Sequence, residues 1–179
     1  MAKIKIQKMD VGGNYLTIYN YNTLGGRGWC QGMTSIDDGA VTFADGESFC
    51  VNNGQGATIT FRISGEVSIE PQTATLPEQF SLTGNLTPMT VDLTDIIPCD
   101  VNGNTLTSSM AKIKIQKMDA DGNYLTIYNY NTLGGRGWCQ GMTALTKGQV
   151  TFAPGESFCV NNGQGVPIIL KFPSPLTTK

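Results

Sequence analysis

The stretch KIKIQKM at residues 3–9 returns unchanged at residues 112–118, and a whole segment of the chain is written twice around it. At an offset of 109, residues 1–56 and 110–165 differ at eight of 56 positions and so match at 48. Most of the differences fall at 11–12 and 35–38, where turns are expected. An internal repeat constrains the architecture before any motif is considered.

Alternation within the repeated stretch predicts a half-buried β-strand. Ile113 and Ile115 point to one face and Lys112 and Lys114 to the other, which is the period of two that strands show. Met118 breaks this phase, so a β-bulge is expected near residues 116–118. The turn residues DADGN then lead into a second alternating run, YLTIYNYN, which indicates a hairpin.

Short β-type runs separated by Gly and Asn turns continue through the second copy, at the density of a β-sandwich. A hairpin is expected at APGE (153–156), and VDLTDIIP (91–98) allows one short helical turn at most. The fold class predicted is all-β, with two related β-sandwich modules of Ig-like or Greek-key type. The expected strands are 80–85, 89–96, 111–118, 123–131, 136–141, 150–152, 157–162 and 167–172.

The predicted domains are a first, incomplete module at 1–78 and a second module at 79–179, which contains the central strands 80–95. Residues 57–109 occur once, so each copy lacks strands that a full unit would have. The missing strands are supplied either by the central segment or by neighbouring chains, since an open edge invites pairing. The expected assembly segments are the edges 2–9 and 167–172, the donor 80–95, and Cys99.

Composition excludes several classes of function. The net charge is −2, only 15% of residues are charged, and no basic stripe exists, so nucleic-acid binding is not expected. No apolar run reaches the ~20 residues of a membrane helix, and no signal peptide is visible. The chain has no histidine, the commonest general base and metal ligand. We therefore expect no enzyme activity and no cofactor.

Four of the five cysteines form two pairs with the same spacing of 20 residues. Intra-domain disulfides Cys30–Cys50 and Cys139–Cys159 are the leading interpretation, which implies an oxidising compartment. Buried thiols that behave as small apolar side chains are the alternative. Cys99 is left over, either unpaired or linked to another chain.

Two turn segments resemble the start of a calcium loop, although no metal site is expected. Oxygen-bearing side chains alternate and a Gly permits a tight turn, but the bidentate Glu of such loops is absent. These residues also suit an ordinary hairpin turn. The weak calcium candidates are Asp119, Asp121, Asn123, Asp100 and Asn102.

Aromatic residues recur in both copies and have two interpretations. Tyrosines alternating along the second strand, with one tryptophan per copy, suit a platform for sugar rings or an interface. The alternative is ordinary cross-strand pairing for the tyrosines and a core position for the tryptophans. The candidates are Tyr15, Tyr19, Tyr21, Trp29, Tyr124, Tyr128, Tyr130 and Trp138.

The phrases FSLTGNLTP, TVDLTDIIP, KIKIQKMDADGNY and VTFAPGESFCVNNGQG resemble a repeat of uncharacterised secreted or surface proteins of bacteria. The resemblance covers most of the chain and implies a secreted setting. It brings no established activity, so it assigns a role to no residue.

Together these features predict a non-enzymatic structural protein, extracellular or at the cell surface. It is expected to assemble with copies of itself into a filament or surface layer, by strand exchange or edge pairing. The alternative is a glycan-binding or adhesin module that uses exposed Tyr and Trp side chains. A pair of catalytic carboxylates, as in glycosidases, does not stand out from the turn positions.

Overall fold

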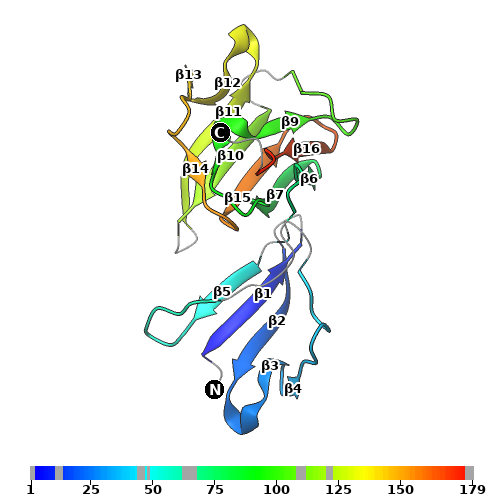
Figure 1. Cartoon of the computed structure of the whole chain (residues 1–179), viewed down its shortest axis with the longest axis vertical. Coiled ribbons are helices and arrows are strands. Elements are labelled where there is room, and N and C mark those ends of the chain that lie inside the picture. Colours follow the sequence, from blue (N-terminus) through cyan, green and yellow to red (C-terminus); the bar gives the residue numbers. More distant parts are fainter. Residues whose placement is uncertain are drawn as a thin grey trace.

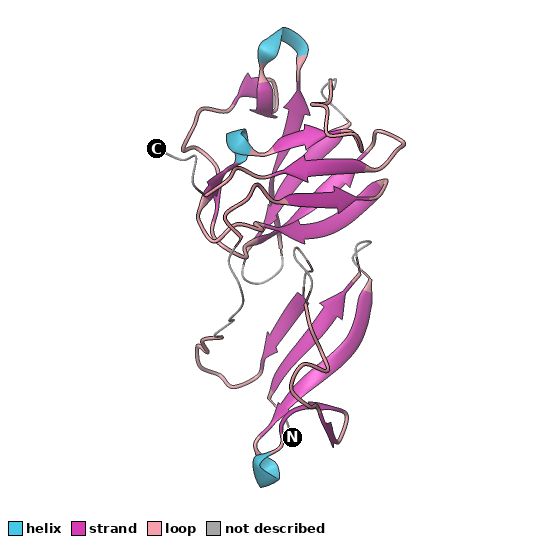
Figure 2. Cartoon of the chain, turned by 45° about the vertical axis from the view of Figure 1, so that its right-hand side comes forward, coloured by secondary structure: helices cyan, strands magenta, loops and turns pink. Residues whose placement is uncertain are grey.

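The structure is a computed structural model that describes residues 3–10, 14–43, 47, 49–61, 68–107, 112–119 and 123–175. It is nearly all β, in antiparallel sheets (Figures 1 and 2). Helical structure in these residues is limited to three 3₁₀ turns, η1 (Leu24–Gly26), η2 (Leu93–Asp95) and η3 (Leu133–Gly135). Among the described residues, none forms a helix of the length and apolarity required to cross a membrane.

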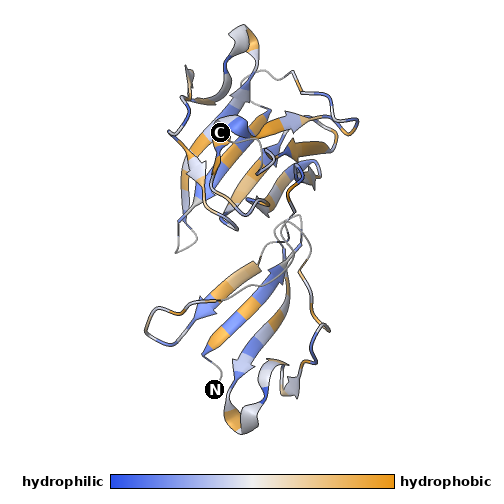
Figure 3. Ribbon diagram, in the orientation of Figure 1, coloured by the Kyte–Doolittle hydropathy of each residue, from blue (hydrophilic) through white to orange (hydrophobic). Residues whose placement is uncertain are grey.

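The first copy of the repeat forms one five-stranded sheet, called here the first sheet. Its order is β4-β3-β2-β1-β5, so β1 is central and β5 is an edge. Apolar and polar residues alternate along its strands (Figure 3). The strands are β1 (Ile4–Met9), β2 (Tyr15–Asn22), β3 (Gly28–Gln31), β4 (Thr34–Ser35) and β5 (Phe49–Asn53).

The second copy forms a six-stranded sheet, called here the second sheet, with order β13-β12-β11-β10-β15-β7. Its first five strands repeat the order of the first sheet, and β7 (Gln79–Gly84) is added beyond β15. The registers also correspond, since Ile6 lies opposite Val51 and Ile115 opposite Val160. The repeated strands are β10 (Ile113–Met118), β11 (Tyr124–Asn131), β12 (Gly137–Gln140), β13 (Thr143–Ala144) and β15 (Ser157–Asn162).

The expected β-bulge is confirmed in both sheets. The β10–β11 register shifts between Gln116 and Met118, and the β1–β2 register shifts between Gln7 and Met9. Two residue steps on β10, from Gln116 to Met118, correspond to three steps on β11, from Ile127 to Tyr124, so the extra residue lies on β11. An extra residue reverses the side on which the following side chains lie.

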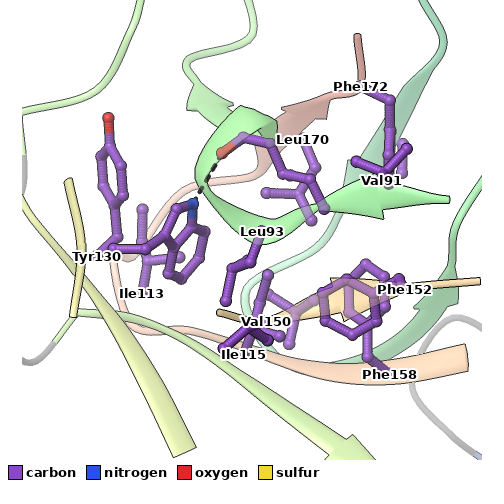
Figure 4. Close-up of a cluster of buried hydrophobic side chains, with 14 of the residues drawn as sticks. Val91, Leu93, Ile113, Ile115, Tyr130, Val150, Phe152, Phe158, Leu170 and Phe172 are labelled. Carbon is purple, nitrogen blue, oxygen red and sulfur yellow. Dashed lines mark hydrogen bonds between the residues drawn. The ribbon is translucent and has the colours of Figure 1, made fainter. Parts of the chain in front are cut away.

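A second layer covers the second sheet and completes a sandwich-like fold. It consists of a three-stranded sheet, β6-β16-β9, and a two-stranded sheet, β14-β8. The side chains of both layers form one buried cluster, in which Ile115, Val160, Leu93, Phe152 and Leu170 are each fully buried (Figure 4). The strands are β6 (Thr73–Leu76), β8 (Val91–Asp92), β9 (Ile97–Cys99), β14 (Thr151–Phe152) and β16 (Ile168–Lys171).

Several expectations about the strands need correction. The run 89–96 is not one strand, because Asp92 caps η2 with its carboxylate and ends β8 there. APGE makes a turn, with Glu156 N–H donating to the Ala153 carbonyl, but β14 and β15 belong to different sheets and form no hairpin. Strand β6 lies before the predicted boundary at 78/79 and pairs with β16 after it.

The predicted edge segments 2–9 and 167–172 are not edges. Strand β1 lies between β2 and β5, and β16 lies between β6 and β9, so their backbone groups are paired on both sides. The central segment 80–95 is used within the chain, because β7 pairs with β15 at the edge of the second sheet and β8 pairs with β14 in the second layer. Among the described residues, no second sheet faces the first sheet.

Candidate binding surface: the open face of the first sheet

The same residues differ in burial between the two copies. Val51 is 41% exposed and Val160 is fully buried, and Phe43 is 41% exposed where Phe152 is fully buried. Half-buried residues of the first copy likewise match fully buried ones of the second, as Ile6 and Ile115 do. The sequence around each pair is nearly identical, so the difference in burial comes from the second layer, which lies over the second sheet. The first sheet therefore presents a core face to solvent, a feature that marks interaction sites.

A groove of ≈ 250 Å³ lies on this face. Apolar side chains line most of it and two acidic residues stand at one side. The lining residues are Ile6, Tyr19, Trp29, Ile36, Val41 and Phe43, with Asp37–Gly39. A concave, mainly apolar surface with a few polar groups is the usual form of a binding site.

The loop that borders the groove is held against the first sheet by Lys8. The Lys8 ammonium donates to the Thr42 carbonyl at 2.8 Å, pairs with Glu47 at 2.7 Å and lies 5.0 Å from the Phe43 ring centre. Lys117 makes the same three contacts in the second copy, with Thr151, Glu156 and Phe152. The groove is therefore formed without a cover, which reduces the entropic cost of filling it.

In the second copy, η2 and its flanks occupy the corresponding place. Leu93 points toward Ile115 and Val150 (Figure 4) and donates its backbone N–H to the Val150 carbonyl at 2.9 Å. Trp138 Nε1 donates to the Ile96 carbonyl at 2.8 Å. The segment 93–96 thus buries the Leu93 side chain and also provides hydrogen-bond partners for Trp138 and Val150.

Asp92 and Asp95 tie the same segment to the loop before β14. The Gly148 N–H donates to Asp92 Oδ2, and Asp92 Oδ1 accepts the N–H and hydroxyl of Thr94. Asp95 pairs with Lys147 at 3.1 Å. The Lys147 side chain is largely exposed, so this ion pair lies at the surface of the sandwich.

The edge of the first sheet is also open. In the second sheet β15 pairs with β7 over six residues, from Ser157↔Gly84 to Asn162↔Gln79. The equivalent strand β5 has β1 on one side and no strand on the other among the described residues. An unpaired edge is a template for strand addition.

The predicted tyrosine row is divided by the bulge. Tyr130 packs on Trp138 in the core, with ring centres 5.2 Å apart, and is 8% exposed. Tyr124 instead packs edge-on against Phe80 at 6.1 Å and remains 53% exposed. Burial excludes Tyr130 and Trp138 as ligand contacts, which corrects their candidacy.

In the first copy the equivalent aromatics stay accessible. Tyr21 packs edge-on against Trp29, with ring centres 5.3 Å apart, and Phe61 stacks on Trp29 at 6.4 Å. Tyr21 and Phe61 remain 40% and 37% exposed. Phe61 thus partly covers Trp29. Tyr15 is exposed, and Tyr19 and Tyr128 are half-buried.

The predicted disulfides are wrong. All five cysteines are thiols, each in the described part of the chain. Cys30 is on β3 and Cys50 on β5, with β2 and β1 between them, and Cys139 and Cys159 are arranged in the same way. Three strand spacings of about 4.8 Å exceed the ~7 Å limit between the Cα atoms of a disulfide.

The thiols differ in access. Cys30, Cys99, Cys139 and Cys159 are buried, and Cys50 is half-buried, with its Sγ 3.9 Å from the Tyr15 hydroxyl. The hydrogen bond with Cys50 raises the pKa of Tyr15. Burial raises the pKa of the Cys99 and Cys159 thiols. Cys99 is 1% exposed, so it presents no surface for a link between chains.

The calcium candidates hold their own loops together. Asp100 Oδ1 accepts the N–H groups of Asn102 and Asn104, and its Oδ2 accepts Asn104 Nδ2. Asp119 likewise accepts the N–H of Asn123 at its Oδ1 and Asn123 Nδ2 at its Oδ2. Asp121 lies outside the described residues. The hydrogen bonds from Asn104 lower the pKa of Asp100. Across the described chain, no three acidic or cysteine side chains form a metal-binding group.

Sequence patterns did not identify the groups that matter most at this surface. Alternation places Asp92, Leu93 and Ile96 in a strand, and the difference between Asp38 and Lys147 falls at an expected turn. A signal for the latter existed, because 35–38 is the longest run of differences between otherwise matched copies.

The chain matches no protein-family model, no curated protein and no solved structure.

Proposed function

We propose that this chain is a non-enzymatic structural protein, extracellular or at the cell surface, that assembles with other subunits through the first sheet. Copies of the same chain are the first partners to test, and a filament or surface layer is the expected product. The observation that carries the proposal is the contrast between Val51 and Val160, which have equal sequence surroundings and opposite burial. A core face without a cover lowers its free energy by binding one.

Two kinds of contact contribute to such an assembly: strand pairing at the edge of β5, and burial of the open face of the first sheet. Added main-chain hydrogen bonds at β5 fix the register, and apolar burial supplies most of the affinity. Exchange of residues 80–95 between copies covers one sheet at the expense of another, because each chain holds one such segment and two repeated sheets. Edge pairing at β5 gains contacts without that loss.

The test compares two lysine substitutions on opposite faces of the first sheet. Val51→Lys places a charge on the open face, opposite Ile6, while Ile18→Lys lies opposite Gln7 on the reverse face. Both residues are exposed in the single chain, so neither change unfolds it. Light scattering and negative-stain microscopy should show assembly of the native protein and of Ile18→Lys, and its loss in Val51→Lys. A native protein that stays monomeric, or assembly lost only in Ile18→Lys, would contradict the proposal.

A glycan-binding function is the second candidate, and one observation favours it. Tyr21, Trp29 and Phe61 form a contiguous, accessible aromatic group on the open face. Aromatic rings with a polar tip suit a sugar ring. Affinity electrophoresis in polysaccharide gels discriminates the two functions, because retardation lost in Trp29→Ala and kept in Ile18→Lys supports glycan binding.

A further inference from the structure

The second copy indicates which kind of polypeptide fits the open first sheet. We propose that the first sheet is the acceptor for a segment from another subunit with the pattern of residues 79–98, carrying a basic or neutral side chain at the position of Asp95. This inference rests on the proposed function and specifies its partner. The hydrogen-bonding groups of the first sheet, the groove and the charge at the side of the groove each support it.

Every hydrogen-bonding group with which the second copy holds the segment 92–96 has a counterpart in the first. Trp138 Nε1, the Val150 carbonyl and the Gly148 N–H each bond to the segment 92–96. Their counterparts are Trp29 Nε1, the Val41 carbonyl and the Gly39 N–H, and for these no hydrogen-bond partner is present within the described residues.

The groove has the position that a leucine equivalent to Leu93 needs. Trp29, Val41 and Phe43 line it, and their counterparts Trp138, Val150 and Phe152 belong to the buried cluster that contains Leu93. Strand β5 offers the edge that β15 offers to β7. A single segment can therefore pair at the edge, cross the end of the sheet and fill the groove, as 79–98 does.

The charge at the rim differs between the two copies. Lys147 pairs with Asp95 in the second copy, and Asp38 stands at the equivalent position in the first. Asp37 stands beside it where the second copy has Thr146. A donor with aspartate at the position of Asp95 meets a like charge there, and one with lysine meets an opposite charge. The chain's own segment is thereby directed to its second sheet, and a donor of opposite charge is preferred at the first.

The experiment uses three synthetic peptides that span residues 79–98, together with the full chain. One peptide has the native sequence and one carries Asp95→Lys. The third adds Leu93→Asp to Asp95→Lys, as a control without the apolar side chain that fills the groove. Binding is followed by the indole N–H resonances of Trp29 and Trp138. We expect the Asp95→Lys peptide to shift Trp29 alone and to bind ~2- to 10-fold more tightly than the native peptide, since exposed charge pairs have modest effects. The control peptide should not bind.

The chain variant Asp38→Lys completes the cycle, because Asp38 is exposed and its replacement removes no buried contact. In this variant the native peptide should bind more tightly than the Asp95→Lys peptide. Absence of binding, a shift at Trp138 instead of Trp29, or the same preference in both chains would overturn the inference. A native chain that stays monomeric yet binds the peptide defeats only the proposed self-assembly. A chain that assembles yet ignores both peptides defeats only this inference.

Discussion

Trp138 donates its indole N–H to the carbonyl of Ile96, 42 residues earlier in the chain, at 2.8 Å. Trp29 has the same neighbours in sequence, GGRG before it and CQG after it, but no such acceptor in the described residues. Trp138 is 2% exposed, whereas Trp29 is half-buried. The environment of each tryptophan is therefore set by what covers its sheet and not by the local sequence.

Replacement of the two tryptophans should have unequal effects. Trp138→Ala leaves a large cavity and an unpaired Ile96 carbonyl, so the free energy of unfolding should fall by ~3–5 kcal/mol. Trp29→Ala removes a half-buried side chain and should cost only ~1–2 kcal/mol. Native-state hydrogen exchange on β10 and β1 measures the two effects separately. Equal losses would contradict the difference in cover.

A buried amide joins the two layers of the covered half. Asn85 Nδ2 donates to the carbonyls of Met89 and Phe152 at 2.7 and 3.0 Å, and its Oδ1 accepts from Thr87. Asn85→Ala leaves several buried polar groups without partners, so we expect a loss of ~2–4 kcal/mol. Urea denaturation provides the measurement, and Asn102→Ala, at an exposed turn, is the matched control with little effect. A neutral result at Asn85 would mean that water replaces its hydrogen bonds.

The loop at residues 100–104 predicts a pH effect. Hydrogen bonds from Asn104 lower the pKa of Asp100, so the folded carboxyl titrates below the unfolded value of ~3.9. A lowered folded pKa gives stabilisation that is present above the unfolded pKa and is lost as pH falls through the folded one. Carboxyl NMR titration should show the Asp100 pKa rising toward its ordinary value in Asn104→Ala. An unchanged titration would assign the lowering to other groups.

Most of the strands could be predicted from the sequence because alternation and turn residues act locally. Ile113 and Ile115 indicated a half-buried strand, and the phase change at Met118 indicated the bulge, as found. The stretch 91–98 allows one short helical turn, where η2 lies, but the pattern also places 89–96 in a strand and does not show that Asp92 caps the turn. Strand β6 has only four residues and gave no long alternating run.

The candidate site could not be predicted because it depends on contacts far apart in the chain. The spacing of 20 residues between Cys30 and Cys50 recurs in the second copy and suggests a disulfide, yet the strand order puts two strands between these cysteines. Tyr124 and Tyr130 are an even number of residues apart, which predicts the same face of the strand, but the bulge between them gives them different neighbours. Cover of one copy and not the other is a tertiary property that near-identical sequences do not reveal.

The cysteines give a prediction that separates thiols from disulfides in one measurement. A thiol-specific reagent should find five thiols in the unfolded chain without reductant, because all five are reduced. In the native protein one should react quickly, namely Cys50, which is half-buried, while the four buried thiols react only after opening. Burial raises the pKa of Cys159, which further slows its reaction at neutral pH. Cys50→Ser should remove the fast phase, and Cys159→Ser, the matched change in the second copy, should leave it. A total of one thiol in the unfolded chain would instead restore the disulfide interpretation.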